Sequence, residues 1–248
     1  PGHDVSGVVT ALGPGARGLA VGDEVFGLVD FPRDGSAAEY VAVPADALAA
    51  KPRTLDHVRA AAVPLSALTA WQALFDHARL AAGGRVLIHA AAGGVGAYAV
   101  QLARWRGVDV VATASARHAA FVAGLGARRV IDYATTRFED VARDVDAVID
   151  PVGGETRERS WQTLRPGGVL VGLSGPIRQD PARRQDVTGT FFVVRPDRRT
   201  LAEIAGLIDA GAVRPSVEAT YPLAEGRRAF ERAAAGHLSG KIVLTVVA

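Results

Sequence analysis

The sequence predicts an α/β protein whose central parallel sheet is covered by helices on both faces. From residue 85 to about residue 194, short apolar runs alternate with segments of helical spacing, as expected when each strand is followed by a crossover helix. Residues 145–149 are apolar almost throughout, which is typical of a strand buried on both faces of a parallel sheet. We expect strands at residues 86–90, 109–113, 129–132, 145–150, 168–173 and 190–194.

The segments that flank this alternating region differ from it. Residues 1–50 hold short apolar runs between Gly and Pro turns, which indicates a small barrel or sandwich with strands near 5–12, 24–28 and 39–43. Residues 54–78 predict two helices, the first ending before Pro64 and the second starting at Ser66 or Thr69. After residue 195 we expect a helix at 200–210, a strand at 217–221, a helix at 224–235 and a strand at 240–247.

Composition excludes several classes of protein. The 248 residues are 49% hydrophobic and 22% charged, as in a globular protein with a sizeable core. The net charge of +2 gives no sign of a nucleic-acid partner, and the absence of cysteine excludes disulfides and thiolate metal ligands within this chain. No apolar run approaches the ~20 residues of a membrane span and no signal peptide is visible, so we expect a cytoplasmic location. The chain opens at Pro1 and contains no methionine, so we expect a segment of a longer protein.

The most informative stretch is a glycine-rich turn between the first strand and the first helix of the alternating region. After the apolar residues 86–88, the pattern G-x-G-x-x-G falls on Ala91, Gly93 and Gly96, with alanine at the first position. In a Rossmann dinucleotide-binding unit the second glycine lets the backbone approach the pyrophosphate, and the third lets the helix pack closely. The free N–H groups at the helix start, near Val95, would face the phosphates. A tight turn without a ligand is the alternative, and the strand–helix–strand context favours dinucleotide binding.

The end of the second strand indicates which nicotinamide cofactor is bound. NAD-binding units place an acid there, about 20 residues after the first glycine, to bind the ribose 2′-hydroxyl. Residues 112–118 contain no acid, and Ser115 and Arg117 instead offer a hydroxyl and a guanidinium suited to a 2′-phosphate. We therefore predict NADP(H). The alternative for Arg117 is a solvated residue at a helix start.

A family resemblance runs in order along nearly the whole chain. Its segments are residues 1–9, 21–25, 38–40, 64–71, the glycine turn, 130–133, 150–154 and 240–244. Together they resemble the medium-chain dehydrogenase/reductase superfamily, and most of all its zinc-independent quinone-oxidoreductase branch. The resemblance implies an NADP-binding Rossmann domain at residues 73–194 and a mostly β, GroES-like catalytic domain split between residues 1–72 and 195–248. Family members normally have further strands before the segment that opens this chain, so we expect the N-terminal part of the catalytic domain to be missing from it.

The resemblance also implies four groups of cofactor-binding residues. They form the glycine turn, flank the adenosine phosphate, lie at the carboxyl ends of later strands, and line the nicotinamide pocket. In that order they are Ala91, Gly93, Gly94, Val95 and Gly96; Ser115, Arg117 and Tyr133; Val152, Leu173 and Ser174; and Thr69 with Phe191, Phe192 and Val193. For the two phenylalanines the alternative is an ordinary place in the strand core, and for Tyr133 it is a surface loop.

His3 raises the question of zinc. In zinc-dependent relatives a Gly-His-Glu segment supplies a zinc ligand at this position, whereas Asp4 follows His3 here. Catalytic zinc needs three protein ligands, and residues 64–67, where relatives supply a further one, contain no metal-binding side chain. We therefore expect no metal and a His3 side chain hydrogen-bonded to backbone. An upstream cysteine would lie in the missing segment.

The resemblance implies an NADPH-dependent reductase that transfers hydride to a quinone or to the C=C bond of an α,β-unsaturated carbonyl. Without a metal the developing oxyanion needs hydrogen-bond donors, for which Thr69 is the candidate, and solvent could supply the proton. The alternatives are a zinc-dependent alcohol dehydrogenase, a non-catalytic NADPH-binding protein, and an enoylreductase domain of a larger synthase. Relatives are commonly homodimers through the edge of the Rossmann sheet, which residues 191–194 would form. No Ser-His-Asp grouping supports a hydrolase.

Overall fold

The computed structural model describes residues 1–32, 35–177, 186–236 and 238–246, and it divides into two compact units. The first unit comprises Pro1–Leu68 and Val194–Ala248, and the second comprises Thr69–Val193. The chain therefore leaves the first unit, builds the second and returns. The assignment of a catalytic role to the first unit stays a prediction.

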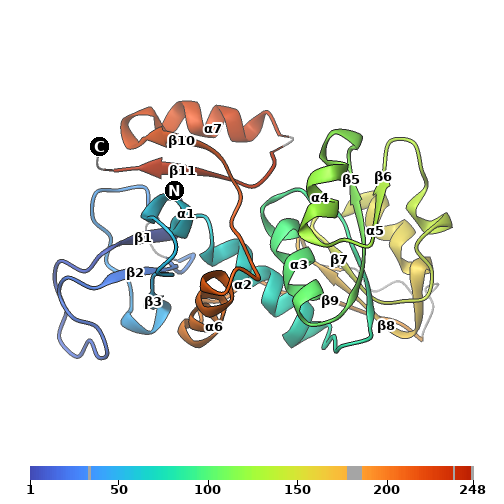
Figure 1. The fold of residues 1–248 in the computed structure, drawn as a ribbon, viewed down its shortest axis with the longest axis horizontal. Coiled ribbons are helices and arrows are strands. Elements are labelled where there is room, and N and C mark those ends of the chain that lie inside the picture. Colours follow the sequence, from blue (N-terminus) through green and yellow to red (C-terminus); the bar gives the residue numbers. More distant parts are fainter. Residues whose placement is uncertain (33–34, 178–185, 237, 247–248) are drawn as a thin grey trace. The chain divides into compact units, whose positions relative to one another are not determined.

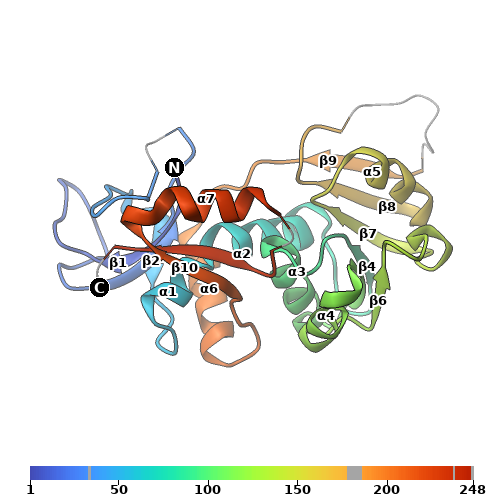
Figure 2. The same cartoon turned by 90° about the horizontal axis from the view of Figure 1, so that it is seen from above.

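The second unit is built on a six-stranded parallel sheet with the order β6-β5-β4-β7-β8-β9 (Figure 1). Its strands are β4 Arg85–Ile88, β5 Asp109–Ala114, β6 Arg129–Asp132, β7 Val145–Asp150, β8 Leu164–Gly172 and β9 Thr188–Phe191. The chain builds outward from β4 to β6, then reverses and continues from β7 to β9 on the other side; Figure 2 shows β7, β8 and β9 side by side. This is the order of a doubly wound Rossmann sheet, so the predicted α/β fold is confirmed.

Helices connect these strands, and their positions follow from local sequence. The principal ones are α3 Gly94–Trp105, α4 Ala119–Leu125 and α5 Gly154–Ser160, with short 3-10 helices at Ala116–His118, Phe138–Asp140 and Trp161–Thr163. Helix α4 ends at Gly126, whose φ of 114° is left-handed and favours glycine. The three central residues of β4, Val86, Leu87 and Ile88, are all fully buried, as expected for a strand covered on both faces. Among the described residues, no helix combines the length and apolarity needed to cross a bilayer.

Among its described residues the first unit contains two small sheets and three complete α-helices, and a fourth α-helix, α2, begins in this unit and ends in the second. Strands β1 Asp4–Val8, β2 Glu24–Leu28 and β3 Leu48–Ala50 form an antiparallel sheet, and β10 Val217–Pro222 pairs in parallel with β11 Lys241–Thr245. The helices are α1 His57–Ala61, α2 Pro64–Trp71, α6 Arg198–Asp209 and α7 Gly226–Ala234. Asp56 and Asp197 cap α1 and α6 by accepting backbone N–H groups, which fixes where both helices begin.

Three expectations for this unit need correction. The strand expected at residues 39–43 is wrong: these residues form no strand, and no described strand pairs with them. Strand β3 was not expected, because its alanine-rich residues have low β propensity; pairing with β2 decides their conformation. The second helix starts at Pro64 and not at Ser66 or Thr69, because proline fits the first turn of a helix, where its missing N–H has no partner to lose. It continues into a π-helical turn at Gln72–His77.

Candidate functional site

The glycine turn joins β4 to α3 at the carboxyl edge of the sheet, where the strand order reverses. A Cβ atom added at Gly96 would lie 2.4 Å from the carbonyl oxygen of Ala90 and 2.7 Å from the Cα atom of Ala91. Both atoms belong to the backbone and cannot move aside, so only glycine fits there. A Cβ atom at Gly93 would approach the Ala90 oxygen only to 3.3 Å. Close packing therefore explains Gly96 more than Gly93.

The first turn of α3 presents backbone N–H groups that the helix itself cannot satisfy. Gly93 is the N-cap and has no side chain to cap them. The first N–H group with an intrahelical acceptor is that of Ala97, which donates to the Gly93 carbonyl at 3.0 Å. The N–H groups of Gly94, Val95 and Gly96 are left at the positive end of a 12-residue helix. These three N–H groups suit a phosphate, because the helix end is positive and the glycine-rich turn leaves space for the phosphate to approach the backbone closely.

His89 is buried directly after β4 and was not anticipated as a site residue. Its Nδ1 atom is 3.1 Å from Thr113 Oγ1, and its Nε2 atom is 2.9 Å from Ser160 Oγ. Ser160 Oγ donates to the Thr156 carbonyl, so it accepts from Nε2–H of His89. Burial lowers the pKa of His89 from 6.5 to about 4, with partial opposition from the charge of Asp150. The neutral His89 side chain thus links β4 to β5 and α5. Its position directly after a buried strand is the sequence signal that could have identified it as a site residue.

The residues expected near the adenosine phosphate follow two neighbouring strands. Ala114 of β5 pairs with Asp132 of β6, and the N–H group of Tyr133 donates to the Ala114 carbonyl at 3.4 Å. Ser115 and Tyr133 therefore leave the sheet at the same edge, next to the glycine turn. Tyr133 is 53% exposed, and Arg117 is exposed as well.

His118 also belongs to this part of the edge, although the motif did not single it out. Its Nδ1 atom lies 3.4 Å from Ser115 Oγ across the 3-10 helix Ala116–His118. The structure thus adds an imidazole to the hydroxyl and the guanidinium expected from the sequence. All of these groups are suited to an anionic ligand.

Val152, Leu173 and Ser174 follow β7 and β8 at the same edge. Val152 is 50% exposed, and the N–H group of Leu173 donates to the Asp150 carbonyl at 2.8 Å, which extends the pairing of the two strands. The hydroxyl of Ser174 already accepts a hydrogen bond from Arg157 Nη2 at 2.8 Å. Arg157 was not identified from the sequence as a site residue, because nothing in the local sequence around it indicates a long-range contact.

The residues expected around the nicotinamide differ in how far they are exposed to solvent. The ring of Phe192, just after β9, stacks on His77 with centroids 4.2 Å apart, so one of its faces packs against protein. Val193 is 63% exposed, Phe191 is half-buried, and Thr69 in α2 is buried. Apart from Thr69, every expected cofactor residue follows or ends a strand at the carboxyl edge of one sheet.

His3 and Asp4 lie in the first unit and make structural contacts. His3 Nδ1 is 3.3 Å from the Val29 carbonyl oxygen, and its ring packs on Phe31. The two carboxylate oxygens of Asp4 accept from the N–H group of Leu65 at 2.5 Å and from Lys241 Nζ at 2.9 Å. Asp4 thereby joins β1 to the start of α2 and to β11. In the described part of the chain, no three His, Cys, Asp or Glu side chains are grouped as metal ligands.

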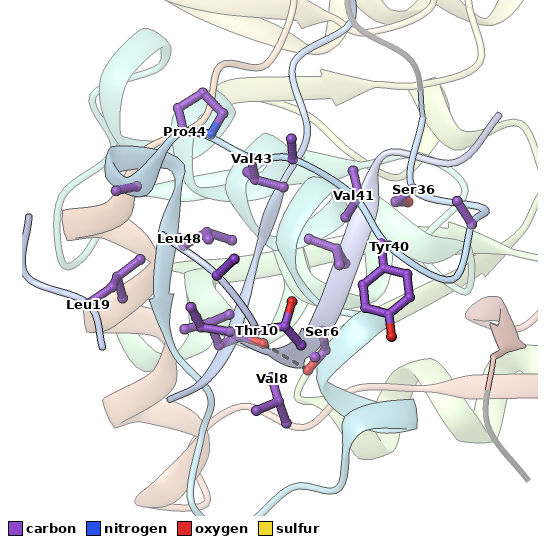
Figure 3. A pocket seen from close by; sticks show the side chains of 18 of the residues that line it. Ser6, Val8, Thr10, Leu19, Ser36, Tyr40, Val41, Val43, Pro44 and Leu48 are labelled. Atoms are coloured by element: carbon purple, nitrogen blue, oxygen red, sulfur yellow. Dashed lines mark hydrogen bonds between the residues drawn. The ribbon is translucent and has the colours of Figure 1, made fainter. Parts of the chain in front are cut away.

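The first unit also contains a cavity of about 1390 Å³, bounded by β1, residues 38–46, α1 and β11 (Figure 3). Every residue that lines it belongs to the first unit, so it is distinct from the glycine turn. Ser6 stands at its wall, with Oγ 2.8 Å from His57 Nδ1, while His57 Nε2 is 3.1 Å from Glu24 Oε1. Ser6 Oγ also donates to the Val25 carbonyl at 3.2 Å, so these contacts tie β1, β2 and α1 together.

Comparison with known proteins agrees with this geometry. Residues 1–53 match the alcohol dehydrogenase GroES-like domain family, and residues 125–244 match the zinc-binding dehydrogenase family. The quinone oxidoreductase structure from Coxiella burnetii has a TM-score of 0.90 and 33% identity, over 99% of this chain and 79% of that chain. The chain belongs to the medium-chain dehydrogenase/reductase superfamily. The expected resemblance to this superfamily is thereby confirmed.

Two further superfamily relatives differ in length from this chain. The chloroplastic NADPH-dependent alkenal/one oxidoreductase of Arabidopsis thaliana is 34% identical over 98% of this chain and 63% of its own length. The spectinabilin polyketide synthase system protein NorB of Streptomyces orinoci is 39% identical over 99% of this chain and 12% of its own length. The chain therefore spans somewhat less than two thirds of the Arabidopsis relative and a small part of the synthase protein.

Proposed function

We propose that the protein is an oxidoreductase that binds NADP(H) at the carboxyl edge of the second unit and reduces a quinone or the C=C bond of an α,β-unsaturated carbonyl. The observation that carries the proposal is the turn at residues 91–96, where Gly96 is enforced by backbone packing and the first N–H groups of α3 stay unpaired within the helix. The names of the Arabidopsis and Coxiella relatives support the substrate class.

The residues fit the cofactor in chemistry and in space. The N–H groups of Gly94, Val95 and Gly96 would bind the pyrophosphate, because they lie unpaired at the positive end of α3. Glycine at position 96 lets α3 pack against the backbone of Ala90 and Ala91. When bound, the nicotinamide supplies the hydride. Thr69 would donate a hydrogen bond to the developing oxyanion, with solvent supplying the proton. Val152, Leu173, Ser174, Phe191, Phe192 and Val193 would orient the nicotinamide half.

The preference for NADP(H) rests on Ser115, Arg117 and Tyr133. A test is to titrate the protein with NADPH and NADH and to compare Arg117→Gln with Arg129→Gln, since Arg129 is exposed at the opposite, amino end of β6. Loss of a charged hydrogen bond to the 2′-phosphate should weaken NADPH binding roughly 10-fold in Arg117→Gln and leave NADH binding unchanged. Arg129→Gln should bind both as the wild type does. Tighter wild-type binding of NADH would refute the assignment.

Thr69 can be tested separately as the oxyanion donor. Thr69→Val should lower kcat about 10-fold or more with little change in NADPH affinity, because the hydroxyl would act only in the transition state. Thr69→Ser keeps a hydroxyl and should retain more of the activity. An unchanged kcat in Thr69→Val would assign the donor role elsewhere.

A second candidate function is enoyl reduction within a larger synthase, which the 39% identity to a segment of NorB favours. A panel of quinones, enones and α,β-unsaturated thioesters separates the candidates: turnover confined to thioesters would favour the synthase activity. NADPH binding without turnover on any of them would favour a non-catalytic protein. Activity abolished by a chelator and restored by zinc would favour an alcohol dehydrogenase.

The expected assembly and location belong to the same proposal. Among the described strands β9 is an edge of the six-stranded sheet, although it ends at Phe191 and does not reach residue 194 as expected. A second copy could pair with it and extend the sheet in a homodimer. Light scattering after size exclusion would measure the mass. We also propose a cytoplasmic location, which fractionation of cells would test.

A further inference from the structure

A buried ion pair stands at the ends of β7 and β8. Asp150 is the last residue of β7 and is fully buried. Its Oδ1 atom accepts the N–H groups of Val152 and Gly153, both at 2.9 Å, and its Oδ2 atom accepts Arg157 Nε at 2.7 Å. The carboxylate therefore shapes the loop that follows its own strand and also holds the guanidinium of α5.

Arg157 carries these contacts across to the loop that follows β8. Its side chain is 9% exposed. Its Nη1 atom donates to the carbonyl oxygens of Gly175 at 3.1 Å and Pro176 at 3.3 Å, and its Nη2 atom donates to Ser174 Oγ at 2.8 Å. One planar guanidinium thus links β7 to residues 174–176. Only a rigid fork of several donors can do this, and an ammonium group cannot.

Two glycines leave the room that this arrangement needs. A Cβ atom at Gly153 would lie 2.5 Å from Ser174 Oγ, and a Cβ atom at Gly172 would lie 3.0 Å from Arg157 Nη2. The two loops and the guanidinium are therefore packed against one another without slack. A movement of Arg157 would be felt at Ser174.

The direction of the hydrogen bond determines what Ser174 can do. Because Ser174 Oγ accepts from Arg157, its own O–H stays available as a donor, and the residue is exposed at the carboxyl edge. We infer that Arg157 is a positioning residue that sets the loops at residues 151–154 and 173–176 and fixes the Ser174 hydroxyl as a donor to an acceptor oxygen of the nicotinamide nucleotide. This inference rests on the proposed function.

The chain offers a matched control two residues away in the same helix. Arg159 binds the buried carboxylate of Glu139 at 2.6 and 2.8 Å, but the contacts of this pair lie among α5 and the segment after β6, not in the two loops. Arg157→Lys and Arg159→Lys each keep the charge and lose the fork. If Arg157 served only stability, the two variants would behave alike.

The experiment compares Arg157→Lys, Arg159→Lys and Ser174→Ala with the wild type. We expect both lysine variants to lower Tm, but only Arg157→Lys to weaken NADPH binding by fluorescence titration, roughly 10-fold. Ser174→Ala should weaken binding as well, and the double variant Arg157→Lys/Ser174→Ala should bind no worse than Arg157→Lys alone, because both changes remove the same donor. Amide exchange should rise at residues 151–154 and 173–176 in Arg157→Lys and not in Arg159→Lys.

Four outcomes would overturn the inference. If Arg157→Lys bound NADPH as tightly as the wild type despite a lower Tm, Arg157 would have only a stabilising role. Equal loss of affinity in Arg159→Lys would show a general effect of unfolding. Unchanged exchange in the two loops would show that Arg157 does not set them, whatever the affinity. If the wild type binds neither NADPH nor NADH, the proposed function falls first and the inference falls with it.

Discussion

The two halves of the second unit reach the same carboxyl edge by opposite means. On the β4–β5–β6 side the backbone shapes the edge: Gly96 has no room for a side chain, and polar groups such as Tyr133 point outward. On the β7–β8 side a buried charge pair, Asp150 and Arg157, shapes it through hydrogen bonds to two loops. The first half should therefore be most sensitive to an added carbon atom at Gly96, whereas the second should be most sensitive to the loss of a buried charged group.

Removing the carboxylate should have the largest effect. Asp150→Ala leaves the buried Arg157 without its counter-ion and two N–H groups without an acceptor, so we expect a loss of about 3–5 kcal/mol in the free energy of unfolding. Urea titration measures it. Asp140→Ala is the control, because its ion pair with Arg137 is exposed and 3.8 Å long and should contribute under about 1 kcal/mol. If both substitutions lowered the free energy of unfolding equally, the buried Asp150 carboxylate would contribute no more to stability than the exposed Asp140 carboxylate.

Acid should weaken the link between the halves, because His89 contacts Thr113 on one side and Ser160 on the other. The pKa of His89 is lowered to about 4, so the unfolded chain binds more protons between pH 4 and 6.5. Stability from this group is complete above pH 6.5 and declines as pH falls, by about 3 kcal/mol at pH 4.

Unfolding measured at pH 7 and at pH 4.5 tests this in His89→Gln, which should lose the dependence, and in His118→Gln, which should keep it. The pKa of Glu139 is lowered to about 2 by its hydrogen bond with Arg159, and its contribution is lost only as pH falls below about 4.5. The window from pH 4.5 to 6.5 therefore isolates His89. A flat wild-type profile in that window would contradict the assignment.

An added methyl group tests the first half directly. Gly96→Ala places a carbon 2.4 Å from a backbone oxygen and should lower the free energy of unfolding by about 2–3 kcal/mol. The same change should also weaken NADPH binding. Gly93→Ala meets the same oxygen only at 3.3 Å and should cost less than about 1 kcal/mol. If thermal unfolding ranks the two variants in the other order, backbone packing does not shape this turn.

The smallest expected change is a gain. Ala90 has φ 48°, a left-handed conformation that costs a residue with a Cβ atom about 1–2 kcal/mol. Ala90→Gly relieves this cost but adds freedom to the unfolded chain, so we expect a net stabilisation of about 0.5–1 kcal/mol. A rise in Tm would show it. A fall would mean that the Ala90 methyl group contributes more by packing than it loses by strain.

The comparison also shows what the sequence could predict. Backbone-driven features are local: the apolar run at residues 86–88 and the glycines that follow it lie within a dozen residues, so the strand, the turn and the helix could be predicted together. The side-chain network is not local, since Arg157 bonds to carbonyl groups up to 19 residues away, which only the folded chain brings near. Nothing in the pattern of α5 distinguishes Arg157 from Arg159.

The small sheet of the first unit was less predictable for a related reason. The apolar alternation at residues 39–43 is real, but a strand also needs a neighbour, and no described segment provides one. Strand β3 is the opposite case, because its residues have weak β propensity but form a strand by pairing with β2. Tertiary context decided both cases.

The open side of β1 has a consequence for how this chain behaves in solution. Strand β1 lies at the edge of its sheet, contains neither lysine nor proline, and borders a cavity where Val8 is 52% and Tyr40 is 76% exposed. Such an edge is a template for an added strand. Concentrated samples should therefore aggregate through this face, and more so in sulfate, which strengthens apolar association. Handling at low concentration and low sulfate, or masking the edge with a strand-forming peptide, should keep the chain dispersed.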